Sequence, residues 1–250
     1  MSASSANLTD RSSRPTVLTL AGVEARKMVD TRAGFWLLAL TALAAVGGTL
    51  GQSLGSKAAS AQAVDVFFTA ASAVGVLLPI VGILLVTSEW SQRTGLITFT
   101  LVPARGRIVA AKLMASIAVA VSAGLICLAL GLLGGSALGA GSELDVAEAG
   151  RGLLFLAISV LSGVSLGLAF ENSPVAIVFY FAGPILVGAV GAISSSIGDI
   201  TRWIDQSGLI TLVEMDRSGV EWDRVAVTAL VWVALPLAVG MIRLRRGDID

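Results

Sequence analysis

The chain has 250 residues, of which 55% are hydrophobic and 14% charged, and its mean hydropathy is +0.87. Soluble domains carry roughly 45–50% apolar and about 25% charged residues, so this composition indicates a membrane protein. Seventeen basic residues balance seventeen acidic ones, and because no dense basic cluster stands out we predict no nucleic-acid partner. The chain has no histidine, which excludes Ser/His dyads and His-ligated metal sites. We therefore expect that the chain is not an enzyme and holds no cofactor or metal of its own.

Six apolar stretches approach the ~20 residues that a helix needs to cross ~30 Å of hydrocarbon. They cover residues 34–54, 64–87, 108–133, 152–170, 174–197 and 225–242. Each should be helical, because lipid cannot satisfy the polar groups of an irregular backbone. The sequence thus predicts an all-α integral membrane protein, with a cytosolic N-terminal tail over residues 1–33 and a six-span transmembrane domain over residues 34–250.

Prolines and glycines inside these spans give local expectations. Pro79 and Pro184 fall within the second and fifth spans, where we expect kinks. Gly163 and Gly167 form a small-x-x-x-small pattern that permits two helices to approach closely. Packing within one subunit is the favoured interpretation of this pattern, and a dimer contact is the alternative.

The distribution of Lys and Arg predicts the orientation in the membrane. Placing the N-terminus in the cytosol puts twelve basic residues inside: Arg11, Arg14, Arg26, Lys27, Arg32, Arg93, Arg105, Arg107, Lys112, Arg243, Arg245 and Arg246. Five remain outside: Lys57, Arg151, Arg202, Arg217 and Arg224. We therefore predict that both termini are cytosolic, and that the segment between the second and third spans is cytosolic as well.

The connection over residues 198–224 mixes apolar and charged side chains, which predicts an outer insertion of short amphipathic helices with its Trp residues at headgroup depth. Asp65 and Glu171 fall at the ends of spans, where snorkelling to water explains them. Trp36 and Trp232 are interpreted as facing the bilayer, and lining a substrate cavity is the alternative for both.

The cytosolic segment SEWSQRTGLITFTLVPARGRIVAAK, which begins at Ser88, has the pattern of an amphipathic helix. Glu89 and Arg93 are four residues apart in the stabilising order, and Trp90, Ile97 and Leu101 recur on one side of a helical wheel. Pro103 then ends the helix. Lys112 follows about one turn inside the third span, from where its side chain is expected to reach the headgroups. The segment is either a solvated linker that sets orientation or a lever that a cytosolic partner can push.

This segment resembles the permease subunits of bacterial ABC-2 type transporters, which are ABC exporters. The residues that carry the resemblance are Glu89, Thr94, Leu101, Pro103, Arg105 and Lys112. The sequence VEARKMVDTRAGFWLL is similar to the family's lead-in to the first span, and it contains Glu24, Lys27 and Arg32. The resemblance implies an amphipathic connecting helix over residues 16–32 and a coupling helix over residues 89–102 that docks on an ATP-binding subunit. The implied coupling residues are Glu89, Trp90, Arg93, Thr94, Ile97, Leu101, Pro103 and Arg105.

The resemblance also implies the composition of the working complex. Two permease chains, either two copies or a copy and a paralogue, would join two ABC-type ATP-binding subunits in the bacterial plasma membrane and export a hydrophobic or amphipathic substrate. ATP and Mg would bind to the partner, because GQSLGSKAA at Gly51 departs from the spacing of a phosphate-binding loop. The alternatives are a non-transporting membrane scaffold that recruits a cytosolic partner and a secondary transporter. The latter typically shows inverted repeats and several mid-membrane charges, and neither is visible in the sequence.

Overall fold

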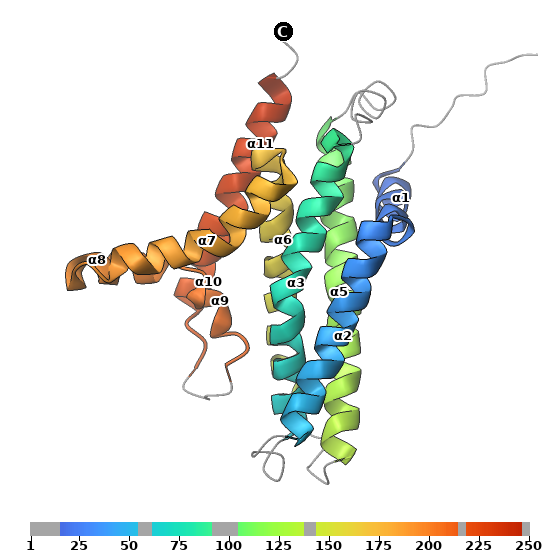
Figure 1. The fold of residues 1–250 in the computed structure, drawn as a ribbon, viewed down its shortest axis with the longest axis vertical. Helices are drawn as coiled ribbons and strands as arrows, with labels where there is room; N and C mark the ends of the chain where they lie inside the picture. The colour runs from blue at the N-terminus through green and yellow to red at the C-terminus, as the bar shows by residue number, and fades with distance from the viewer. Residues whose placement is uncertain (1–15, 55–61, 92–104, 138–143, 215–218, 247–250) are drawn as a thin grey trace, which may run out of the picture.

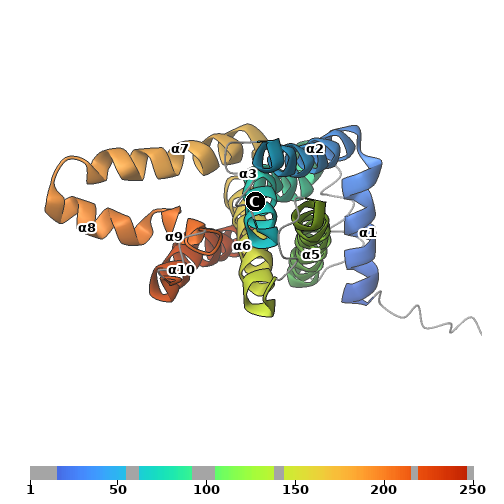
Figure 2. The same cartoon turned by 90° about the horizontal axis from the view of Figure 1, so that it is seen from below.

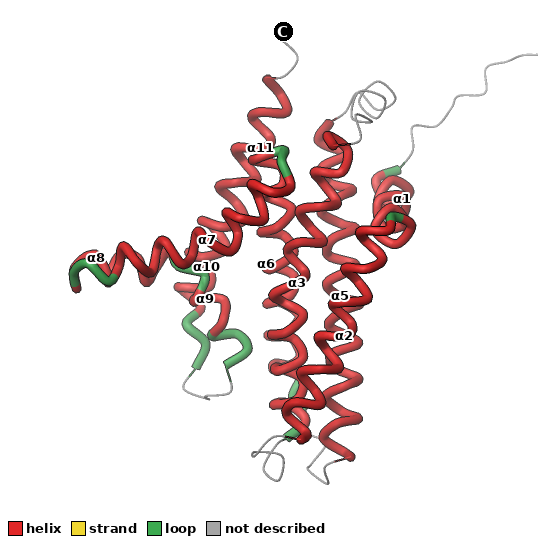
Figure 3. Tube along the Cα trace, in the orientation of Figure 1, coloured by secondary structure: helices red, strands yellow, loops and turns green. Residues whose placement is uncertain are grey.

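The computed structural model describes residues 16–54, 62–91, 105–137, 144–214 and 219–246. Within these ranges the chain folds into helices joined by short turns, and no strand is present among them (Figure 3). Six of the described helices are long and apolar enough to cross a membrane. The fold is therefore all-helical, as the sequence predicts, and its helices are those of a multi-pass membrane protein.

The N-terminal part of the chain forms a bundle. Its helices are α1 (Val17–Asp30), α2 (Arg32–Leu54), α3 (Ala63–Ser91), α5 (Arg105–Ala137) and α6 (Val146–Phe170). Figure 1 shows α2, α3, α5 and α6 running side by side along the long axis, with α1 lying across one end. The chain crosses the bundle in alternating directions, so α1, the end of α3, the start of α5 and the end of α11 all lie towards the same end.

The core of the bundle is the contact between α3 and α6, the two spans with the largest buried share of their length. Glycines on both helices bring the backbones together. A side chain at Gly163 would overlap the carbonyl group of Pro79, and a Cβ at Gly82 would lie 2.6 Å from the carbonyl oxygen of Val160. Gly167 faces α3 as well, since its Cβ would lie 3.2 Å from the carbonyl oxygen of Ile83. Packing within one subunit, the favoured interpretation of the Gly163 pattern, is thus confirmed.

The C-terminal part of the chain forms an arm beside the bundle. It consists of α7 (Ser173–Gly191), α8 (Ser195–Ile204), α9 (Ser207–Ile210), α10 (Trp222–Ala229), a π-helix η2 (Leu230–Ala234) and α11 (Leu235–Arg246). Figure 2 shows α7 leading away from the bundle and α8 returning beside it. This hairpin is tight because Gly191 and Gly198 face each other across it, with the Cβ position of Gly198 3.1 Å from the Gly191 carbonyl oxygen.

Two predicted boundaries are wrong. The fifth span ends at Gly191 rather than at residue 197, because the hydroxyl of Ser194 accepts from the backbone of Ile197 and starts α8. The fourth span begins at Val146 rather than at residue 152, because Asp145 and Glu148 form a capping box that extends α6 beyond its apolar stretch. Both errors arise where a cap, rather than hydrophobicity, sets the end of the helix.

Candidate coupling site

Helix α1 forms within the range predicted for the connecting helix. It begins after Thr16, whose hydroxyl accepts a hydrogen bond from the backbone of Thr19, and it ends where Thr31 turns extended. One side of α1 packs against α5 and buries Ala21 and Glu24, whereas Leu18 on another side is exposed. A helix that buries a carboxylate needs a partner for that charge, because an unpaired buried charge is very costly.

Lys112 on α5 is that partner. Its Nζ lies 2.8 Å from Oε2 of Glu24 and donates a second hydrogen bond to the carbonyl oxygen of Leu85 on α3, at 3.1 Å. The side chains of Lys112 and Glu24 are only 2% and 7% exposed. The expectation that Lys112 reaches the headgroups is therefore wrong: the ammonium group points into the bundle, where a carboxylate and a backbone carbonyl replace its water.

Lys27 completes the charge balance from the surface. Its Nζ lies 2.7 Å from Oε1 of Glu24, and its own side chain is 44% exposed. Burial alone would raise the pKa of Glu24, but the charge of Lys112 and the hydrogen bonds from Lys112 and Lys27 together lower that pKa below its usual value. Glu24 is therefore ionised at neutral pH, and both of its oxygens are bound.

This ion pair joins three helices near the predicted coupling helix. Lys112 stands seven residues after Arg105, and Leu85 six residues before Ser91, so each lies about 10 Å along its helix from the ends of the segment over residues 92–104. Glu24 brings α1 to the same point. The pair thus connects α1 to the two helices that flank that segment.

The predicted coupling residues divide into two groups. Glu89 and Trp90 form the last turn of α3 and Arg105 is the first residue of α5, although the structure describes only their backbone. The other predicted residues lie outside the described residues: Arg93, Thr94, Ile97, Leu101 and Pro103. Of the residues predicted for the connecting helix, Glu24 and Lys27 lie on α1 and meet in the ion pair, whereas Arg32 is the exposed first residue of α2.

Polar contacts also join the arm to the bundle at this end. The hydroxyls of Thr87 on α3 and Ser173 on α7 are 2.6 Å apart. Arg243 on α11 donates to the carbonyl oxygen of Ala169, at 2.5 Å, and lies 3.9 Å from the carboxylate of Glu171. Glu171 is half-buried beside this arginine at the end of α6, and its snorkelling to water stays a prediction.

Three other predicted side chains have clear positions. Asp65 caps the start of α3, since its carboxylate accepts a hydrogen bond from the backbone of Gln62 at 2.8 Å. Trp36 is 70% exposed on α2, as a bilayer-facing residue would be. Trp232 is only 4% exposed, so bilayer-facing packing is wrong for this residue. Its ring lies against that of Phe179, with the centroids 6.0 Å apart, and its indole N–H donates to the carbonyl oxygen of Ile204, at 2.8 Å.

Comparison with known proteins returns no match, either to a family model or to a curated protein. The likeness to ABC-2 type permeases therefore depends on the residues quoted above. What the structure adds is the connection between Glu24 and Lys112, two residues that carry the resemblance and lie 88 positions apart in the sequence.

Proposed function

We propose that the chain is the membrane-spanning permease subunit of an ATP-binding cassette transporter, with both termini in the cytosol of a bacterial cell. ATP and Mg bind to a separate ATPase, of which two copies serve a pair of permease chains. The complex exports a hydrophobic or amphipathic substrate. Six apolar helices and the excess of Lys and Arg at the end that carries α1 support this assignment.

The buried ion pair between Glu24 and Lys112 is the observation that carries the proposal. A solvated linker needs no rigid connection to its neighbours, whereas a lever does. Here α1, α3 and α5 meet at one ammonium group, that of Lys112. Breaking such a pair leaves a buried charge without a partner, which is costly. The contact therefore persists, and the three helices move as one body when a partner pushes on the segment.

In this mechanism ATP binding closes the dimer of ATPase subunits, and the ATPase displaces the 89–102 segment. The displacement passes through α3 and α5 to the bundle and through Lys112 to α1. The size of the response is limited by the difference in binding free energy of the ATPase for the two states of the permease.

The test is reconstitution of the chain in lipid nanodiscs with the ATPase that the adjacent reading frame encodes. We expect a stable complex in which ATP hydrolysis depends on the permease. Glu24→Gln should reduce this stimulation while the complex still forms, because α1 is disconnected but the docking segment is unchanged. Arg26→Gln is the matched control, since Arg26 is exposed on the same helix and is not part of the contact between Glu24, Lys112 and Lys27.

Three results would contradict the proposal: a neighbouring gene product without nucleotide-binding motifs, no association, or labelling of a cysteine at Thr94 from the outside of intact cells. Association without substrate-dependent ATP hydrolysis would favour the scaffold instead. The labelling requires a Cys127→Ala background, in which no native thiol remains.

A further inference from the structure

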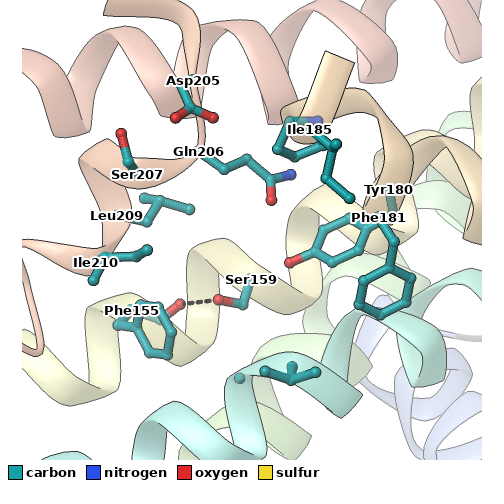
Figure 4. Close-up of a pocket in the computed structure, with 13 residues that line it drawn as sticks. Phe155, Ser159, Tyr180, Phe181, Ile185, Asp205, Gln206, Ser207, Leu209 and Ile210 are labelled. Atoms are coloured by element: carbon teal, nitrogen blue, oxygen red, sulfur yellow. Dashed lines mark hydrogen bonds between the residues drawn. The ribbon is translucent and has the colours of Figure 1, made fainter. Parts of the chain in front are cut away.

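A cavity of about 440 Å³ lies between α3, α6, α7 and the turn that joins α8 to α9. Figure 4 shows its lining side chains converging from these elements. The volume falls within the range of roughly 300–1,000 Å³ typical of small-molecule sites. The cavity does not include the Glu24 and Lys112 pair, so it is separate from the candidate coupling site.

Most of the cavity wall is apolar. Phe155 of α6 and Tyr180 and Phe181 of α7 contribute three aromatic rings, and aliphatic side chains such as Ile185 and Leu209 fill the space between them. Aromatic rings favour stacked or edge-to-face contacts with other rings. The wall therefore suits a molecule with an apolar body that contains rings.

One polar group in the cavity lacks a partner. The Nε2 atom of Gln206 is buried and makes no hydrogen bond within the described part of the chain. Figure 4 shows the Gln206 side chain reaching from the turn towards Tyr180 and Ser159. The Ser159 hydroxyl donates its own proton to the carbonyl oxygen of Phe155 at 2.7 Å, so it does not offer that proton to a bound acceptor. A buried donor without an acceptor is unfavourable, so an acceptor on a bound molecule would be stabilised here.

The charge of the lining adds a second restriction. Asp205 is the one ionisable carboxylate among the lining residues, and none of them is Lys or Arg. The nearby Arg224 donates to Ser207 but is also paired with Glu221. Within the lining an anion would meet the Asp205 carboxylate, and the Arg224 guanidinium lies behind Ser207, where it is paired with Glu221. A neutral or cationic molecule would not be repelled by Asp205.

The side of the cavity formed by the α8 and α9 turn is held in place from behind. Trp232 donates to the carbonyl oxygen of Ile204, and Thr228 donates to that of Asp205, at 3.1 Å. Trp232 lies in the π-helix η2, and such a local widening of a helix often occurs at functional sites. The turn that presents Gln206 is therefore fixed, as expected of a largely pre-formed site.

We propose that this cavity binds a neutral or cationic amphipathic molecule whose ring-containing body packs against Phe155 and Phe181 and whose hydrogen-bond acceptor pairs with Gln206. Binding depends on this chain alone. Because binding needs no ATPase, the binding proposal is unaffected if the proposed coupling to an ATPase is wrong. Equally, a failure to bind would not contradict the proposed coupling.

Benzophenone tests the proposal directly, because it combines two rings with a ketone acceptor and forms covalent bonds to its neighbours under ultraviolet light. The full chain in nanodiscs is irradiated with benzophenone, and the labelled peptides are mapped by mass spectrometry. We expect saturable labelling in the peptides that contain Tyr180 to Ile185 or Gln206 to Ile210. An aminomethyl derivative should label the same peptides, whereas the carboxylate derivative should bind at least several-fold more weakly.

Two variants report on the cavity rather than on folding. Gln206→Leu removes the donor and should raise the benzophenone concentration at half-maximal labelling about 3- to 10-fold, the effect of one hydrogen bond. Val76→Trp places a large side chain on the lining and should abolish saturable labelling, whereas Val178→Trp, at an exposed position on α7 outside the lining, should leave it unchanged.

Labelling that does not saturate, or that neither Gln206→Leu nor Val76→Trp changes, would mean that lipid chains fill the cavity, and it would overturn the proposal. Stronger binding of the carboxylate derivative would overturn the charge preference and with it the role of Asp205.

Discussion

The bundle and the arm are both held by charged side chains, but in different surroundings. In the bundle, Lys112 and Glu24 pair within a nearly dry contact between helices. In the arm, Arg202 and Arg224 both bind Glu221, which joins the end of α8 to the start of α10 where water reaches the charges. The first arrangement is shielded from water, whereas the second is partly open to water and therefore to salt. This difference suits a bundle that transmits force and an arm that borders a binding cavity.

The largest expected effect is in the bundle. Lys112→Met leaves the Glu24 carboxylate buried without its main partner and should lower the free energy of unfolding by about 3–5 kcal/mol. The double variant Lys112→Met with Glu24→Leu removes both charges and should recover most of that loss, because apolar side chains of similar volume often replace a buried pair at little cost. Thermal unfolding in detergent measures both. A single variant as stable as the native chain would show that the pair does not hold α1.

Glycine packing gives the next largest effect. At Gly163 an added methyl group meets the backbone of Pro79, which cannot rotate away. Gly163→Ala should therefore destabilise the bundle by about 1–3 kcal/mol. Gly150→Ala on the same helix is the control, since nothing lies within 4 Å of its Cβ position and alanine favours helix there. Equal melting temperatures for the two variants would contradict the close contact between α3 and α6.

In the arm the expected loss is smaller and local. Arg224 is largely buried and donates to Glu221, to the hydroxyl of Ser207 and to the carbonyl oxygen of Arg202. Arg224→Met should cost about 1–2 kcal/mol, because water partly replaces these bonds. The loss should appear as faster amide hydrogen exchange over residues 195–210, with the bundle unchanged. Arg202→Met, at a side chain that is 61% exposed, should change exchange little. Faster exchange throughout α3 and α6 would show that the arm and the bundle unfold together.

The sequence predicts the bundle better than it predicts the arm. Six apolar stretches give the six spans because length and composition alone decide which helices can cross a membrane. The close contact at Gly163 is also predictable, since glycine spacing repeats along one helix face. In the arm, however, the boundary between α7 and α8 depends on Ser194 and Gly191, which are ordinary residues in an apolar context. The fifth span predicted from hydropathy therefore includes the first residues of α8.

The ion pair and the cavity could not be predicted from the sequence, for a different reason. Glu24 and Lys112 were each marked by their spacing, but nothing local indicates that two charges 88 residues apart meet in a buried contact. Gln206 carried no signal, because a polar residue in a connection between two spans is unremarkable until Tyr180 and Phe155 are placed around it. Trp232 was misjudged similarly: an indole on an apolar helix suggests lipid contact unless a carbonyl group, here that of Ile204, lies in reach.

Acid should affect the two ionic clusters alike, whereas salt should distinguish them. The hydrogen bond from Arg224, with the charges of Arg224 and Arg202, lowers the pKa of Glu221, just as Lys112 and Lys27 lower that of Glu24 despite its burial. Both carboxylates start from an ordinary value of 4.5, so the stability they add is present above about pH 4.5 and is lost as the pH falls through their lower folded values. Amide exchange in α1 and in α8 should thus be flat from neutral pH down to about pH 5, apart from the intrinsic rate, and should then accelerate in both.

Salt at neutral pH should distinguish the Glu221 cluster from the Glu24 cluster, which acid does not. At about 1 M the screening length falls to about 3 Å, which weakens the water-exposed contacts of Glu221 but hardly reaches Lys112. We expect α8 to exchange faster in high salt while α1 does not change. Glu221→Gln should abolish this salt response in α8, and Glu24→Gln should leave it intact. If α1 responds to salt as α8 does, water reaches the Glu24 carboxylate, and the pair cannot serve as a rigid connection between α1 and the helices that flank the coupling segment.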